Sequence, residues 1–192
     1  MGRTKPQFAA SLYNMNESQH IRDQLLVLRA QADGKAFDAL VGRWHPVLWR
    51  HAYRMTHNPE AAWDVMQEAW CAIFRGLHRL ENPEAFPKWA FQVVTNKCRD
   101  QARSTGRRNR AMQAYERRAE KQATPNTRDE QVELAVMRLD SELRLVVSLY
   151  YKDAFGVREI AEITGWPEGS VKSRLYRARN ELRRLLEEMN HE

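Results

Sequence analysis

The stretch Ala161-Glu-Ile-Thr-Gly-Trp-Pro-Glu-Gly-Ser-Val-Lys-Ser-Arg-Leu-Tyr-Arg-Ala-Arg179 decides the fold of the C-terminal part of this chain. It contains the end of one amphipathic helix, a Gly-Trp-Pro break and the start of an arginine-rich second helix. Ala161 is small enough to let two helices cross closely, and Gly165 stands where the chain must reverse, a position that often needs positive φ. Val171 then falls on the inward face. This spacing predicts a helix-turn-helix, whose second helix lies in the major groove of DNA.

The outward face of the predicted second helix carries polar side chains that suit DNA: Lys172, Ser173, Tyr176 and Arg177. Lysine and arginine donate to guanine edges or to phosphates, serine serves either, and tyrosine offers a ring and a hydroxyl. The alternative is an ordinary solvated face, because arginine is a good helix former and surface charge is common. Both interpretations stay open on this segment alone.

Composition favours a helical protein that binds a polyanion. Of the 192 residues 43% are hydrophobic, and strong helix formers dominate, which predicts an all-α fold. The net charge of +6 and a pI of about 9.5 favour nucleic acid or an acidic membrane as partner. The sequence has no apolar run of the roughly 20 residues that a membrane span needs, and its start lacks a signal segment. We therefore expect a cytoplasmic protein that binds nucleic acid and does not insert into membranes.

Helical periodicity and charge together divide the chain into four parts. We expect a loose tail over residues 1–20, a helical bundle over 21–104, a basic linker over 105–131 and a second helical unit over 132–190. Prolines should separate the helices of the bundle at Asn58-Pro59 and in the loop from Leu80 to Pro87. The expected architecture is two small helical domains joined by a basic tether.

The segment Asp64-Val-Met-Gln-Glu-Ala-Trp70 places a polar, net acidic patch in this basic protein. Asp64, Gln67 and Glu68 share one helical face, away from the apolar Met66 and Trp70. The patch is either an ordinary wet face or a docking surface for a basic or polar partner.

Taken together, these features resemble a known family over about residues 21–187. The motif Asp-x-x-Gln-Glu followed by an aromatic, then Phe86-Pro-x-Trp89 with Asn96, a basic linker and a C-terminal helix-turn-helix are similar to an extracytoplasmic-function (group 4) sigma factor of the sigma-70 family. The resemblance implies a region 2 bundle and a region 4 helix-turn-helix. It also implies promoter-specific initiation with core RNA polymerase, in which region 2 melts and captures the −10 element and region 4 reads the −35 element.

The resemblance assigns roles to individual positions. Asp64, Gln67 and Glu68 would contact core polymerase through its β′ clamp helices, and region 4 would meet the β flap. Single-stranded −10 DNA would meet Leu80, Phe86, Lys88, Trp89, Asn96, Lys97, Arg99 and Arg103. The −35 duplex would meet Lys172, Ser173, Tyr176 and Arg177. Phe86 and Trp89 are either stacking surfaces for bases or core aromatics. The resemblance also implies an anti-sigma factor as partner. Trp63 departs from the family, which often has an acidic residue there.

Two other classes of function remain to be weighed. One is a stand-alone helix-turn-helix regulator that binds duplex DNA without polymerase. The other is an enzyme, for which His45, His51 and His57 are the only clustered candidates. They are six residues apart, a spacing that does not place them on one helical face. The sequence has no catalytic motif, so we expect no enzyme, catalytic residue, metal site or cofactor. Cys71 and Cys98 are expected to be reduced thiols.

Overall fold

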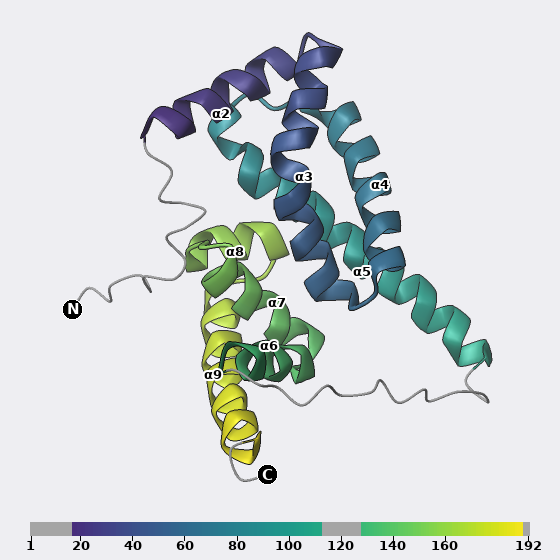
Figure 1. The fold of residues 1–192 in the computed structure, drawn as a ribbon, viewed down its shortest axis with the longest axis vertical. Helices are drawn as coiled ribbons and strands as arrows, with labels where there is room; N and C mark the ends of the chain where they lie inside the picture. The colour runs from purple at the N-terminus through teal and green to yellow at the C-terminus, as the bar shows by residue number, and fades with distance from the viewer. Residues whose placement is uncertain (1–16, 113–127, 190–192) are drawn as a thin grey trace.

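The computed structural model describes residues 17–112 and 128–189, and every regular element in those ranges is helical (Figure 1). The first part contains α2 (Glu17–Ala30), α3 (Gly34–Thr56), α4 (Pro59–Leu77), the short 3₁₀ turn η2 (Pro83–Ala85) and α5 (Phe86–Met112). The second part contains α6 (Arg128–Arg138), α7 (Ser141–Val147), the π-helical turn η3 (Ser148–Lys152), α8 (Val157–Thr164) and α9 (Glu168–Met189). The predicted all-α fold is confirmed. The predicted tail, up to residue 16, and residues 113–127 of the predicted linker lie outside the described residues.

Local chemistry accounts for where the helices begin and end. The side chain of Asp33 accepts a hydrogen bond from the Lys35 amide at 3.0 Å, and this caps α3. Asn58 caps α4 in the same way, and Pro59 occupies the first helical position, where a missing amide costs nothing. Gly165 ends α8 with φ of 72°, which is the left-handed conformation that the helix-turn-helix spacing predicts.

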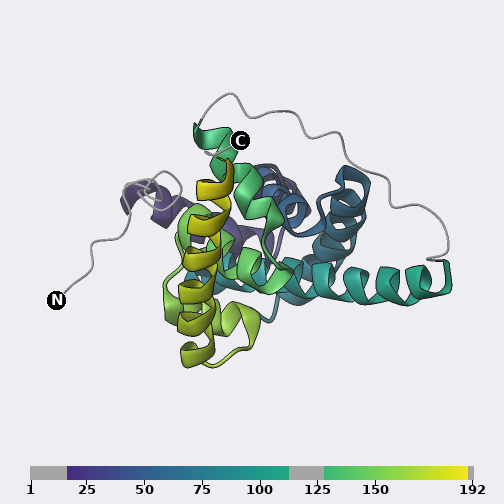
Figure 2. The same cartoon turned by 90° about the horizontal axis from the view of Figure 1, so that it is seen from below.

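Helices α2 to α5 form one bundle, which we call the N-terminal bundle. Its centre is built from large apolar side chains with essentially no exposed surface: Leu40, Leu48, Met66, Ile73, Leu77, Phe86 and Val94. Within each helix they recur four, seven or eight residues apart, so that each helix turns one apolar face inward. Helix α5 extends well beyond the other helices of the bundle (Figure 2).

Helices α6 to α9 form the C-terminal unit. The helix-turn-helix pair α8 and α9 closes over the buried Ile160, Ile163, Val171 and Leu175. A second cluster of buried residues joins α9 to α6 and α7 through Ala135, Leu139, Ala178 and Leu185. The inward position expected for Val171 is confirmed, at 0% exposure, and Leu175, one turn later, is 1% exposed.

The N-terminal bundle and the C-terminal unit are packed against each other. The sequence predicted two tethered domains and gave no sign of this contact. Helix α8 lies along α5, and a single set of buried residues continues from Val27 in α2 to Leu175 in α9 (Figure 1). Phe91 of α5 and Phe155 before α8 meet at this boundary, with ring centroids 4.9 Å apart. Sequence periodicity marks such residues as buried but does not say whether their partners lie in the same domain.

Candidate nucleic-acid and protein interfaces

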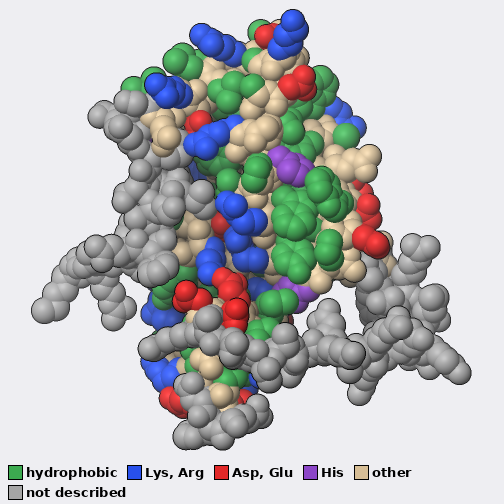
Figure 3. Space-filling view, viewed as in Figure 1, with side chains coloured by type: hydrophobic (Ala, Val, Ile, Leu, Met, Phe, Trp, Pro, Cys, Tyr) green, Lys and Arg blue, Asp and Glu red, His purple; other side chains and the backbone are tan. Residues whose placement is uncertain are grey.

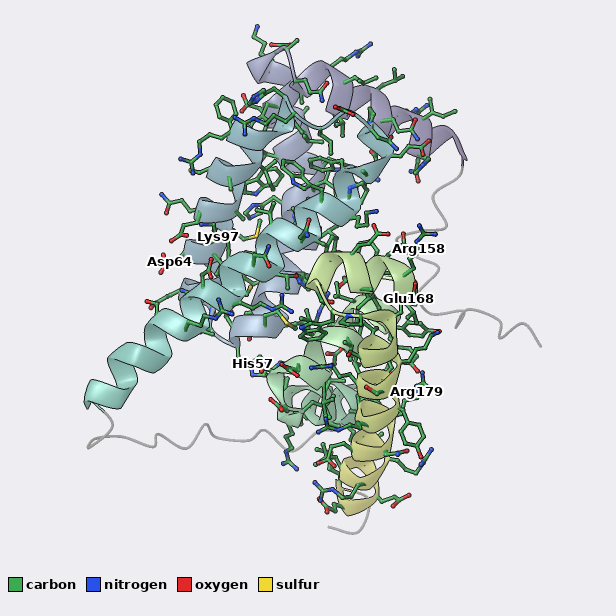
Figure 4. All side chains as sticks on the ribbon, turned by 180° about the vertical axis from the view of Figure 1, so that it is seen from behind. His57, Asp64, Lys97, Arg158, Glu168 and Arg179 are labelled. Atoms are coloured by element: carbon green, nitrogen blue, oxygen red, sulfur yellow. The ribbon has the colours of Figure 1, made fainter. Side chains whose placement is uncertain are left out.

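The exposed face of α9 brings the four predicted DNA-facing residues together. Lys172, Ser173, Tyr176 and Arg177 are all exposed, and Tyr176 keeps 65% of its surface accessible. They can share this face because Val171, Leu175 and Ala178 hold the opposite face of α9 in the core. The segment runs from near Glu168 to near Arg179, both labelled in Figure 4. The face offers cationic, hydroxyl and aromatic groups on a helix free to enter a groove.

Arg174, which lies beside these residues on α9, is used within the protein. Nε of Arg174 donates to Glu142 at 2.9 Å, and its guanidinium lies 4.2 Å from the ring centre of Trp166. Arg179 is half-buried. These contacts fix α9 against α7 and against the turn before it.

The polar face of α4 is exposed as a unit. Asp64, Gln67 and Glu68 point outward, while Val65 and Met66 between them are buried. Asp64 and Gln67 also line a hollow of about 310 Å³. His45 and Trp70 form part of its wall, and the indole N–H of Trp70 donates to Nδ1 of His45 at 3.1 Å.

An aromatic surface borders this acidic face, and sequence reasoning did not find it. Trp63 is 56% exposed and lies 5.1 Å from the ring of His45 and 6.2 Å from that of Trp49. Trp49 in turn stacks on Tyr53. Figure 3 shows the resulting band of apolar side chains over α3 and α4, with histidine at its margins. The signal was present in the sequence as the tryptophan that stands where the family often has an acidic residue.

The residues predicted to meet −10 DNA lie mostly on α5, but they differ in accessibility. Asn96 and Arg103 are exposed. Lys97 donates to Glu68 at 3.0 Å, so it joins the −10 set to the acidic face of α4. Lys88 pairs with Glu162 of α8, and Arg99 donates to the carbonyl of Thr164 at 2.9 Å. Leu80, just after α4, is half-buried and packs against the core.

Phe86 is a correction to the predicted set. It is 0% exposed and lies edge-on to Trp44, with ring centroids 5.6 Å apart, so it is a core residue with no face free for a base. Trp89 packs against the core but is only half-buried. Its ring covers Gly76 so closely that a Cβ there would stand 2.8 Å from it. Of the two aromatics, Trp89 alone keeps exposed surface.

A buried ionic cluster lies between the N-terminal bundle and the C-terminal unit. Nη2 of Arg54 donates to both carboxylate oxygens of Asp153, at 2.6 and 2.8 Å. Nδ1 of His51 lies 3.3 Å from Asp153, an electrostatic contact without hydrogen-bond geometry, and Nε2 of His51 lies 3.0 Å from the Thr95 hydroxyl. Burial alone would raise the pKa of Asp153, but Arg54 and His51 outweigh it and hold that pKa below its usual value.

The described residues were also compared with two other kinds of site, a metal centre and a membrane span. Among the described residues, no group of three or more His, Cys, Asp or Glu is arranged to hold a metal ion. None of the described helices is both long and apolar enough to cross a membrane.

The described residues are helical throughout, with an exposed basic face on α9 in one unit and an exposed acidic face on α4 in the other, an arrangement that suits a two-part DNA-binding protein. Residues 40–108 match the family Sigma-70 region 2, and residues 129–189 match Sigma-70, region 4. The ECF RNA polymerase sigma factor SigM of Mycobacterium tuberculosis is 32% identical over 168 residues, which cover 87% of this chain and 85% of that protein. The chain belongs to the extracytoplasmic-function sigma factors of the sigma-70 family, and it acts as an RNA polymerase sigma factor.

Further similarities support this placement. The ECF sigma-E factor of Escherichia coli is 29% identical over 84% of this chain and 93% of its own length. The structure of RpoE from Bartonella quintana, solved with the anti-sigma factor NepR, has the same fold, with a TM-score of 0.68 at 22% identity over 80% of this chain and 98% of that one. The structure of CnrH, solved with the cytosolic domain of CnrY, has a TM-score of 0.62 at 25% identity, over 86% of this chain and 97% of that one. The partners of a sigma factor, core RNA polymerase and promoter DNA, are therefore partners of this chain.

Proposed function

We propose that this sigma factor uses three surfaces: the polar face of α4 for core polymerase, the adjoining α5 with Leu80 for the melted −10 strand, and the outward face of α9 for the −35 duplex. The observation that carries the proposal is the face of α9. Its four DNA-suited side chains are exposed together, and the residues behind them are in the core. The protein acts as an adaptor in the cytoplasm, and its function requires no catalytic group.

The polymerase surface combines charge with aromatic area. Asp64 and Glu68 give it negative charge that steers a basic partner helix, and Gln67 adds a hydrogen-bonding amide. The exposed Trp63 beside them supplies apolar contact area of the kind that anchors protein interfaces. This arrangement fits a partner with cationic and apolar side chains next to each other, which we assign to the β′ clamp helices.

The −10 surface is assigned to the exposed polar side chains of α5. The Asn96 amide can pair with the edge of a base taken out of the stack, and the half-buried Trp89 offers a partly exposed ring. Lys88, Lys97, Arg99 and Arg103 supply positive charge for the strand's phosphates. Two weak DNA contacts on one chain suffice, because the second contact becomes intramolecular once the first is made.

An anti-sigma protein is proposed as a third partner. The structure of RpoE that shares this fold was solved with the anti-sigma factor NepR. A surface that binds polymerase through exposed aromatic and acidic groups can be covered by such a protein.

Run-off transcription with core polymerase, followed by mapping of the start sites, tests the proposal. We expect transcripts that depend on this chain and start sites that share two upstream elements. The other candidate, a regulator that works without polymerase, predicts high-affinity binding of the chain alone to a duplex operator and no run-off product. That result would remove the assignment of the three surfaces.

A further inference from the structure

We propose that the C-terminal unit binds the N-terminal bundle of the same chain through an interdomain latch, made of His51, Arg54, Lys88, Asp153 and Glu162, and that this closed form occupies part of the −10 surface, Lys88 and Arg99, until the latch opens. The statement about the −10 surface rests on the proposed function of α5. The closure itself rests on the contacts between the two units.

The ionic centre of the latch is Asp153, which is only 5% exposed. Arg54, which compensates its charge, and the neutral His51, which contacts it, both come from α3, about a hundred positions earlier in the chain. A buried carboxylate is stable only with its partners in place. In an open form Asp153 is solvated and needs neither partner. The charge of Asp153 therefore makes the closed form depend on Arg54, whereas the open form does not depend on it.

Aromatic packing surrounds this ionic centre. The ring of Phe91 lies 4.9 Å from that of His51 and 4.9 Å from that of Phe155. Phe91 and Phe155 are each 2% exposed, so the contact between the two units excludes water. An ion pair in such a dry contact is much stronger than the same pair at a surface.

Helix α8 covers α5 beside this centre. Lys88 pairs with the Glu162 carboxylate, and the Gln92 amide donates to the Glu162 carbonyl at 3.2 Å. Arg99 donates to the Thr164 carbonyl and lies 4.9 Å from the Trp166 ring centre. Lys88 and Arg99 are two of the cations assigned to −10 phosphates, and they cannot serve DNA and α8 at the same time. Figure 4 shows α8, with Arg158 labelled, lying against α5.

The backbone before α8 is shaped to bring Asp153 and Phe155 to the boundary between the two units. The π-helical turn η3 ends at Lys152, and Ala154 has φ of 60°, in the left-handed region that non-glycine residues rarely adopt. Asp153 and Phe155 stand on either side of it. Such strained residues persist where the surrounding contacts hold them, and they are found at switch regions. The strain at Ala154 is therefore consistent with a turn that the closed form holds in place.

The test measures the distance between the two units in the full-length chain without polymerase or DNA. Spin labels go on the exposed native Cys71 of α4 and on Asn180→Cys in α9. Cys98 is buried, and burial raises the pKa of its thiol to about 12, which favours labelling of Cys71 over Cys98 at neutral pH. We expect one short distance in the parent chain. Arg54→Ala should lower the closed population by about tenfold or more, because it leaves Asp153 buried without its cation.

Two further variants make the test decisive. Lys152→Ala is the control: it removes an ion pair to Glu133 that lies within the C-terminal unit, and the distance should stay unchanged. Removing a buried cation can unfold a chain, so the double variant Gln92→Ala/Glu162→Gln loosens α8 from the outside, with helix content checked by circular dichroism. A long, broad distance in the parent chain overturns the latch, as does a parent-like distance in every folded latch variant.

The same labelled chain separates the latch from the proposed function. Adding core polymerase to the parent chain should lengthen the distance, and Arg54→Ala should give more run-off product than the parent when core polymerase is limiting. If no run-off product forms with any chain while the distances behave as expected, the proposed function fails and the closure stands. If the label distance shows that Arg54→Ala is open and its run-off yield still equals that of the parent, the latch has no inhibitory role.

Discussion

His51 is fully buried between α3 and α5, and both of its ring nitrogens face polar atoms. The charged groups around it are Asp153, before α8, and Arg54, on its own helix; α5 contributes the uncharged Thr95 and Phe91. Burial lowers the pKa of His51 below 6.5, with a smaller lowering from Arg54, and Asp153 opposes this by raising it. The imidazole is therefore neutral in the folded chain at pH 7.

A pH dependence of stability follows from that lowered pKa. Below about pH 6.5 the unfolded chain takes up a proton on this histidine while the folded chain does not. The free energy of unfolding should therefore fall as pH drops from about 6.5 toward the folded pKa of His51. Above pH 6.5 the stabilising contribution of the neutral His51 should be fully present. Urea unfolding between pH 7.5 and 5.5 measures this.

The variant His51→Gln should reduce that pH dependence, because one titrating group is gone, while His45, whose pKa burial also lowers, keeps its own share. His78→Gln, at an exposed position after α4, is the control and should keep the slope of the parent chain. An unchanged slope in His51→Gln would assign the effect to other groups.

Arg177 is the residue of α9 whose role a single substitution can classify. If it donates to a guanine edge, Arg177→Ala should cost roughly 1–3 kcal/mol of binding to the −35 duplex and relax the preference at one base pair. The exposed Arg183, six positions further along α9, is the matched control. A loss of equal size on specific and scrambled duplexes would instead mean that Arg177 contacts a phosphate.

Among the elements, α4 carries a testable division between its first turn and its middle. Replacing Gln67 and Glu68 together with alanine should weaken binding to core polymerase and leave the fold intact, because both side chains are exposed. Glu60→Ala, an exposed acidic residue in the first turn of the same helix, controls for net charge and should bind as the parent chain does. Fluorescence anisotropy measures the affinity of each variant for core polymerase. Unchanged affinity in the double variant would mean that Gln67 and Glu68 do not contact polymerase.

The elements also show what sequence could and could not predict. The helix break at Asn58-Pro59 and the left-handed Gly165 depend on chemistry within a few residues, so spacing and residue type sufficed. The exposed face of α9 followed from helical period. Phe86 was ambiguous because its burial depends on Trp44, which belongs to a different helix. The contact of Arg54 with Asp153 could not be predicted, because no local pattern joins positions 99 residues apart.

For the whole molecule, the continuous core predicts cooperative unfolding. Buried residues run without interruption from the N-terminal bundle into α8 and α9, so neither part can lose its packing without exposing the other. Calorimetry of the parent chain should give one transition, with equal calorimetric and van't Hoff enthalpies. Arg54→Ala should divide it into two, since it weakens only the shared boundary. Two transitions in the parent chain would mean that the units unfold independently.

The position of Trp166 gives the chain an optical signal for this change. Two guanidinium groups lie over its ring, that of Arg99 on α5 at 4.9 Å from the ring centre and that of Arg174 on α9 at 4.2 Å. Separation of the two units removes Arg99 from the indole and admits water in its place, while Arg174 stays. The emission of Trp166 should then shift to longer wavelength. A difference spectrum between the parent chain and Trp166→Phe would let the opening rate be followed by stopped flow without any attached dye.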